Sequence, residues 1–74
     1  MADRDVERIT SPKAFADLLR RVADSVEKGE SFRIQVQNAR FSVPATAELS
    51  VEHEREGESE ELELQLRWKN AQPA

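Results

Sequence analysis

The sequence predicts a small α+β domain, a two-layer sandwich in which one amphipathic helix packs on one face of a mainly antiparallel sheet. An apolar stripe at helical spacing occupies the first half of the chain. Several later segments alternate apolar and polar residues, and turn-forming residues separate them. One helix followed by alternating segments is typical of this class. The expected order is β-α-β-β-β-β, built from 74 residues around a single core.

The first expected element is a short edge strand at residues 5–9. Val6 and Ile9 fall on opposite sides of an extended backbone. Both therefore cannot face one core unless a bulge intervenes. The sequence predicts a weak edge strand here.

A helix follows, and both of its ends are marked. Ser11 can cap the free backbone amides, and Pro12 suits the first helical position. Gly29 can take the left-handed conformation that ends a helix. Between them, apolar residues recur at spacings of three and four, which predicts one buried stripe. The stripe consists of Phe15, Leu18, Leu19, Val22, Ala23 and Val26.

The next two strands should form a hairpin. Residues 32–36 alternate apolar and polar side chains, and residues 37–40 resemble a turn. Pro44 cannot donate a ladder hydrogen bond, so the strand after the turn should end near it. A two-residue loop at Asn38-Ala39 would pair Val36 with Phe41 and Ile34 with Val43.

The last two strands should form a longer hairpin around residues 56–59. If Gly57-Glu58 is a two-residue loop, Val51 pairs with Leu64, Leu49 with Leu66 and Ala47 with Trp68. A four-residue loop would shift the partners by two but keep the same faces. The predicted core consists of Phe15, Leu19, Val22, Ile34, Leu49, Val51, Leu64, Leu66 and Trp68.

Composition limits the class of protein. Residues 5–69 are expected to form one domain, with disordered ends at residues 1–4 and 70–74. The chain has no cysteine, so disulfides and thiolate metal sites are excluded. The first residues lack the apolar stretch of a secretory signal, and no run approaches the roughly 18 apolar residues of a membrane span. We therefore expect a cytoplasmic protein without membrane contact.

Negative charge is concentrated in the second half of the chain. Residues 46–63 contain eight glutamates and one arginine. Such a block repels phosphate backbones, which disfavours nucleic acid as a partner. With the tight turn, Glu52 opposes Glu63 and Glu54 opposes Glu61, whereas the longer loop pairs Glu54 with Glu63 and Glu56 with Glu61. This face could be merely solvated, could bind a basic partner, or could bind a cation weakly.

Two single residues invite a functional interpretation. His53 is the only histidine and could be a general base or a metal ligand. It lacks a cysteine or second histidine to complete a metal site, so a position at the rim of the core is favoured. Trp68 could be an aromatic platform, but it shares a face with three leucines and fits a core position. The sequence predicts no catalytic, cofactor or metal residue.

The ordered combination of these features resembles the amphi-Trp domain family over about residues 5–69. The resemblance is carried by residues 11–24, Gly29, Pro44, residues 48–52 and the closing stretch 62–68 with its tryptophan. It implies a small bacterial or archaeal protein of β-α-β-meander type, without an established activity or catalytic residues. Arg8 and Pro12-Lys13 depart from the usual pattern of the family, which affects the register of the first strand.

Two functional hypotheses follow. The first is a non-enzymatic protein-binding or assembly module, which uses its sheet edges, its acidic outer face or both to bind another protein or a second copy of itself. Its interaction face would comprise Glu52, Glu54, Glu61 and Glu63. The second is a small-ligand or weak cation-binding protein, or a minor enzyme, with a site near His53 and the hairpin glutamates.

Overall fold

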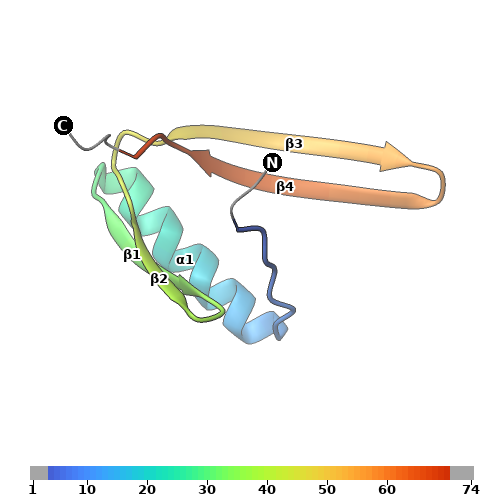
Figure 1. Ribbon diagram of the computed structural model, residues 1–74, viewed down its shortest axis with the longest axis horizontal. Helices are drawn as coiled ribbons and strands as arrows, with labels where there is room; N and C mark the ends of the chain where they lie inside the picture. Colours follow the sequence, from blue (N-terminus) through green and yellow to red (C-terminus); the bar gives the residue numbers. More distant parts are fainter. Residues whose placement is uncertain (1–3, 71–74) are drawn as a thin grey trace.

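The structure, a computed structural model, describes residues 4–70. It contains one helix and four strands, which confirms the α+β class and the order of the helix and strands after it (Figure 1). Of the ends expected to be disordered, residues 1–4 and 70–74, only Arg4 and Asn70 are among the described residues. The elements are α1 (Pro12–Lys28), β1 (Phe32–Val36), β2 (Ala39–Val43), β3 (Glu48–Glu56) and β4 (Ser59–Arg67).

Residues 4–10 form no strand, in contrast to the expected edge strand at residues 5–9. The segment is instead held by side-chain hydrogen bonds at the β1–β2 turn. Arg4 Nη2 donates to the Val36 carbonyl at 2.6 Å, and Gln37 Nε2 donates to the Glu7 carbonyl at 2.8 Å. Its apolar residues do not share a face, and Ile9 is 93% exposed. Without a shared apolar face, little drives this segment into a sheet.

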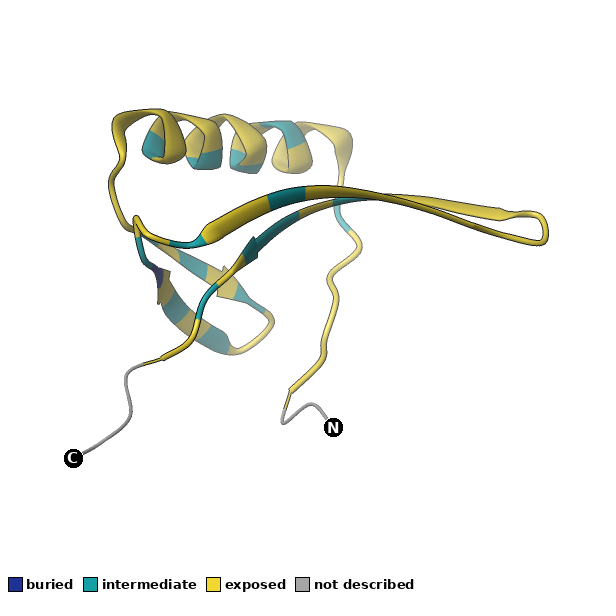
Figure 2. Ribbon diagram, turned by 90° about the horizontal axis from the view of Figure 1, so that it is seen from above, coloured by how far each residue is buried: buried dark blue, intermediate teal, exposed yellow. Residues whose placement is uncertain are grey.

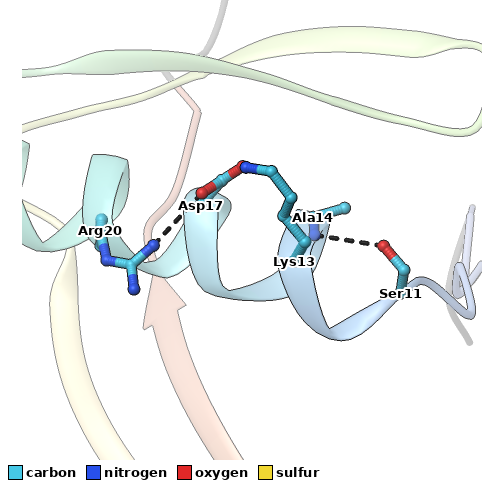
Figure 3. Close-up of polar contacts among 5 residues, drawn as sticks. All are labelled: Ser11, Lys13, Ala14, Asp17 and Arg20. Carbon is cyan, nitrogen blue, oxygen red and sulfur yellow. Dashed lines mark hydrogen bonds and ion pairs between the residues drawn. The ribbon is translucent and has the colours of Figure 1, made fainter.

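Helix α1 begins and ends where the sequence predicts. Ser11 Oγ accepts a hydrogen bond from the Ala14 amide at 3.2 Å, and Pro12 is the first helical residue (Figure 3). Gly29 ends the helix at φ 67°, and its amide donates to carbonyls of the last turn. The cap satisfies backbone groups that the helix itself leaves free.

An ion-pair cluster lies on the exposed side of α1. Lys13 Nζ and Arg20 Nη1 lie 2.9 Å and 3.2 Å from the carboxylate oxygens of Asp17 (Figure 3). Exposed pairs of this kind contribute only about 0–1 kcal/mol each, because water competes for both charges. The cluster therefore keeps this side of the helix soluble and adds little to stability.

The four strands form two separate antiparallel hairpins, β1–β2 and β3–β4, instead of one continuous sheet. The chain changes direction after Val43, where Pro44 lacks the amide that a further ladder bond requires. The Ala47 amide donates to the Pro44 carbonyl at 3.2 Å and closes this corner. The second hairpin consequently leaves the first and projects away from it (Figure 1).

The β1–β2 register differs from the predicted one. Ile34 pairs with Phe41 and Phe32 with Val43, so the predicted Val36–Phe41 and Ile34–Val43 pairs are wrong. The loop is Gln37-Asn38, one residue earlier than expected, with Gln37 at φ 56°. The partners shift by two residues, so the same residues still share a face.

The β3–β4 register is the one predicted for a tight turn. Gly57 takes φ 58° in the two-residue loop, a conformation that glycine adopts without steric cost. Val51 pairs with Leu64 and Leu49 with Leu66. The ladder begins at the Glu48–Arg67 pair, so the expected Ala47–Trp68 contact lies just outside it.

The core is small and lies where α1, the β1–β2 hairpin and the base of the β3–β4 hairpin meet. Val43, at the end of β2, is 4% exposed and is the one fully buried hydrophobic residue among residues 4–70. The Arg21 guanidinium of α1 donates to the Arg33 carbonyl of β1 at 2.7 Å, which fixes the helix beside the first hairpin.

The structure corrects the predicted core. Val22, Ile34, Leu66 and Trp68 are half-buried. Five residues of the prediction are exposed in the single chain: Phe15, Leu19, Leu49, Val51 and Leu64. For the three hairpin residues the reason is the course of the long hairpin, most of which extends beyond the helix and is exposed (Figure 2).

Candidate functional site

The register of the β3–β4 hairpin gives this ribbon two chemically opposite faces. Each strand alternates apolar and polar residues, and opposed residues point to the same side. We call one side the acidic face, formed by Glu52, Glu54, Glu61 and Glu63. We call the other side the apolar face, formed by Leu49, Val51, Leu62, Leu64 and Leu66.

The acidic face brings together all four glutamates that the sequence predicted for an interaction surface. Glu52 pairs with Glu63 and Glu54 with Glu61 across the ladder. The Gln65 amide nitrogen donates to Glu52 Oε2 at 3.1 Å and to Glu63 Oε2 at 2.9 Å. One neutral amide thus bridges two carboxylates and holds them on the same side of the ribbon.

The pKa of Glu61 reflects the crowding of negative charge on the acidic face. A hydrogen bond with Glu63 raises the pKa of Glu61 above its ordinary value of 4.5, and the charges of Glu63 and Glu54 raise it further. A raised pKa means that the folded chain holds this proton more tightly than the unfolded chain does. This contribution to stability is present below about pH 4.5 and is lost as pH rises through the raised pKa.

The variant Glu63→Gln tests this crowding. We expect it to melt at a higher temperature than the wild type at pH 7, because the ladder then opposes one charge fewer. The gap between the two melting temperatures should widen as pH rises above 4.5, since only the wild type loses the protonated Glu61–Glu63 contact. Thermal melts followed by circular dichroism at several pH values measure it. Glu58→Gln, the same charge change in the loop, should show no widening gap.

The carboxylates of the acidic face do not converge on a single point. Within residues 4–70, no group of three or more His, Cys, Asp or Glu side chains is placed to hold a metal ion. The carboxylates follow one another along the ladder, whereas calcium and magnesium need six or more oxygens around one centre. The arrangement suits an extended, positively charged partner better than a single ion.

His53 lies on the other side of the ribbon from the acidic face. It pairs with Leu62, and its Nε2 lies 2.6 Å from Glu60 Oε2. Both side chains are more than half exposed. Ser50 lies on the acidic face, so it cannot act as a nucleophile with His53. The pair is therefore an exposed polar contact near the end of the apolar face.

Trp68 lies directly after β4 and connects the two hairpins. Its ring stacks on Phe41 of β2, with centroids 6.3 Å apart and planes inclined by 29°. Its Nε1 donates to Asn70 Oδ1 at 3.1 Å. Trp68 is half-buried, because neighbouring residues cover most of its surface. Trp68 thus holds the base of the long hairpin against the first hairpin.

The apolar face is the feature that sequence reasoning missed. Four of its side chains, Leu49, Val51, Leu62 and Leu64, are 56%, 71%, 72% and 56% exposed. Near the base, Val26 of α1 joins this face in lining an open groove of about 330 Å³. The length of the strands could have indicated this exposed face. β3 and β4 have nine residues each, whereas β1 and β2 have five. One helix at one end cannot cover such a ribbon.

The closing alternation and its tryptophan also identify the chain. The sequence model of the Amphi-Trp domain family matches residues 3–74. The chain belongs to the Amphi-Trp domain family. A search of curated proteins found no match, and a search of solved structures found none either.

In this Amphi-Trp domain, β4 carries both surfaces at once. Its even-numbered leucines supply the apolar face, and its glutamates supply half of the acidic face. Among residues 4–70, no helix is long and apolar enough to cross a membrane. The candidate site is therefore the projecting ribbon itself, with an apolar face, an acidic face and two strand edges.

Proposed function

We propose that this Amphi-Trp domain is a non-enzymatic protein-binding or assembly module, and that the β3–β4 hairpin is its binding element. The observation that carries the proposal is the exposure of the apolar face, where Val51 and Leu62 are 71% and 72% exposed. Contiguous apolar patches above a few hundred Å² are rare on soluble monomers and mark interaction sites.

The edges of the hairpin support the same function. β3 and β4 pair only with each other within residues 4–70, so each presents one row of backbone groups without a strand partner. Such edges bind extended segments of other chains by continuing the ladder. The apolar face would then add side-chain contacts to the backbone hydrogen bonds.

The acidic face gives the module a preference among partners. The carboxylates of Glu54, Glu61 and Glu63 repel one another, as the raised pKa of Glu61 indicates. A basic surface would relieve this repulsion, whereas an acidic partner would increase it. We therefore propose that the apolar face makes the contact with the partner, and that the acidic face favours basic partners over acidic ones.

The experiment compares three immobilised full-length chains: wild type, Leu62→Glu and Ser59→Glu. Both variants add one negative charge to β4, but only Leu62→Glu places it on the apolar face. Proteins from a lysate of the encoding organism, including the chain itself, are quantified after washing. We expect a set of proteins that wild type and Ser59→Glu retain and that Leu62→Glu loses. Equal retention by all three, or no retention by wild type, would contradict the proposal.

A further inference from the structure

The single chain exposes much more surface than its mass requires. Its accessible surface is 6949 Å², whereas a compact protein of 8.4 kDa exposes about 4,600 Å². Its radius of gyration is 14.1 Å, against about 11 Å for a compact chain of this length. The difference in surface, about 2,300 Å², exceeds the roughly 800 Å² that each partner contributes to a standard interface.

The exposed surface includes both halves of a helix–sheet contact. On α1, Phe15 and Leu19 are 54% and 39% exposed, although they belong to its apolar stripe. On the hairpin, Val51 and Leu62 are exposed on the apolar face. A helix stripe and an apolar sheet face are natural packing partners. In one chain they diverge from a common base, so the far part of each has no cover (Figures 1 and 2).

We propose that the occupant of the apolar face is a second copy of this chain, with the hairpin of each copy lying on the α1 stripe of the other. The inference rests on the proposed function and names its partner. A two-fold axis makes the two contacts equivalent, so neither copy keeps an open apolar face. The lengths agree, because a helix of 17 residues spans about 26 Å and a strand of nine residues about 30 Å.

The charges favour this pairing over contact between two hairpins. Residues 48–67 carry eight glutamates and two arginines, whereas α1 carries four Lys/Arg and three Asp/Glu. A hairpin on the helix of another copy brings a net negative element to a net positive one. Lys13 and Arg20 are each paired with Asp17, so the attraction acts between the net charges of the two elements. Two hairpins face to face would bring two net negative elements together.

The β3–β4 hairpin also needs a packing partner for its own stability. An isolated two-stranded ribbon is marginally stable in water, and most of the β3–β4 hairpin has no third strand or helix beside it. A helix from a second copy supplies the missing layer. Association and the order of the hairpin would then be linked, so dilution should weaken both.

The test is sedimentation of the full chain from about 1 to about 500 µM, near neutral pH. We expect a reversible wild-type dimer. Leu62→Glu on the hairpin and Phe15→Glu on the helix should each weaken it at least about tenfold, because each places a charge in both contacts. Ser59→Glu is the matched control and should leave it unchanged. Circular dichroism of the dilute variants checks that each chain retains its helix.

Mixing Leu62→Glu with Phe15→Glu gives the sharpest result. In the mixed dimer, the intact hairpin of Phe15→Glu meets the intact helix of Leu62→Glu, so one contact is fully restored. We expect the mixture to associate more tightly than either variant alone. If Phe15→Glu has no effect on the dimer, the helix is not the partner surface and the proposed pairing is overturned.

Salt provides a measurement on the unaltered chain. Raising ionic strength above about 0.1 M should weaken the wild-type dimer, because it screens the attraction between the net negative hairpin and the net positive helix. Strengthening by salt would contradict the hairpin-on-helix pairing. A wild-type chain that is monomeric at every concentration overturns the inference. The proposed function still stands in that case if Leu62→Glu selectively loses another retained protein.

Discussion

Replacing Trp68 by alanine is expected to lower the free energy of unfolding by about 3 kcal/mol, the lower end of the range for a large aromatic residue. The ring is half-buried and stacks on Phe41, with centroids 6.3 Å apart. Its loss opens a gap where the long hairpin joins the first one. Urea denaturation followed by circular dichroism measures the effect, since the variant has no tryptophan fluorescence.

Two controls separate packing from the hydrogen bond of the indole. Trp68→Phe keeps an aromatic ring against Phe41 and should cost no more than about 1.5 kcal/mol. Asn70→Ala removes the acceptor of the exposed Nε1 hydrogen bond and should have an effect within about 0.5 kcal/mol. If Trp68→Ala were as stable as the wild type, the tryptophan would not be holding the hairpins together. Its ring would then be a candidate binding surface.

The helix and the tight hairpin could be predicted because their signals are local. Ser11, Pro12 and Gly29 define the ends of α1 within one turn of the chain, and the structure confirms both ends. Gly57 takes a positive φ in a two-residue loop, which fixes every pair of β3–β4. The acidic face follows from that register, so opposed glutamates could be named from the sequence.

The other elements depend on information that the pattern does not contain. The β1–β2 loop is one residue earlier than predicted because Gln37, which has no special turn signal, takes the positive φ. Residues 5–9 form no strand, because the spacing of Val6 and Ile9 gives an extended segment no common apolar face, and the two residues are 44% and 93% exposed. The sequence also predicted a single sheet, but the corner after Pro44 separates the last four predicted strands into two hairpins.

The apolar face shows the same limit at the candidate site. Alternation states which side chains share a face, as it did for Leu49, Val51 and Leu64. It does not state what covers that face. The sequence therefore predicted a core where the single chain exposes a surface. These residues have core character in the sequence and surface positions in the chain, a combination that a second copy would reconcile.

The small core makes its one fully buried hydrophobic residue critical, and Val43→Asp is expected to unfold most of the protein at 25 °C. Val43 is 4% exposed and lies opposite Phe32 at the end of β2. Burial of a carboxylate without a partner costs several kcal/mol, comparable to the roughly 4–11 kcal/mol that stabilises a chain of this length. Ser42→Asp makes the same charge change on the exposed neighbour and should remain folded. Circular dichroism and urea denaturation compare the two, and a cooperative wild-type transition in Val43→Asp would mean that the core lies elsewhere.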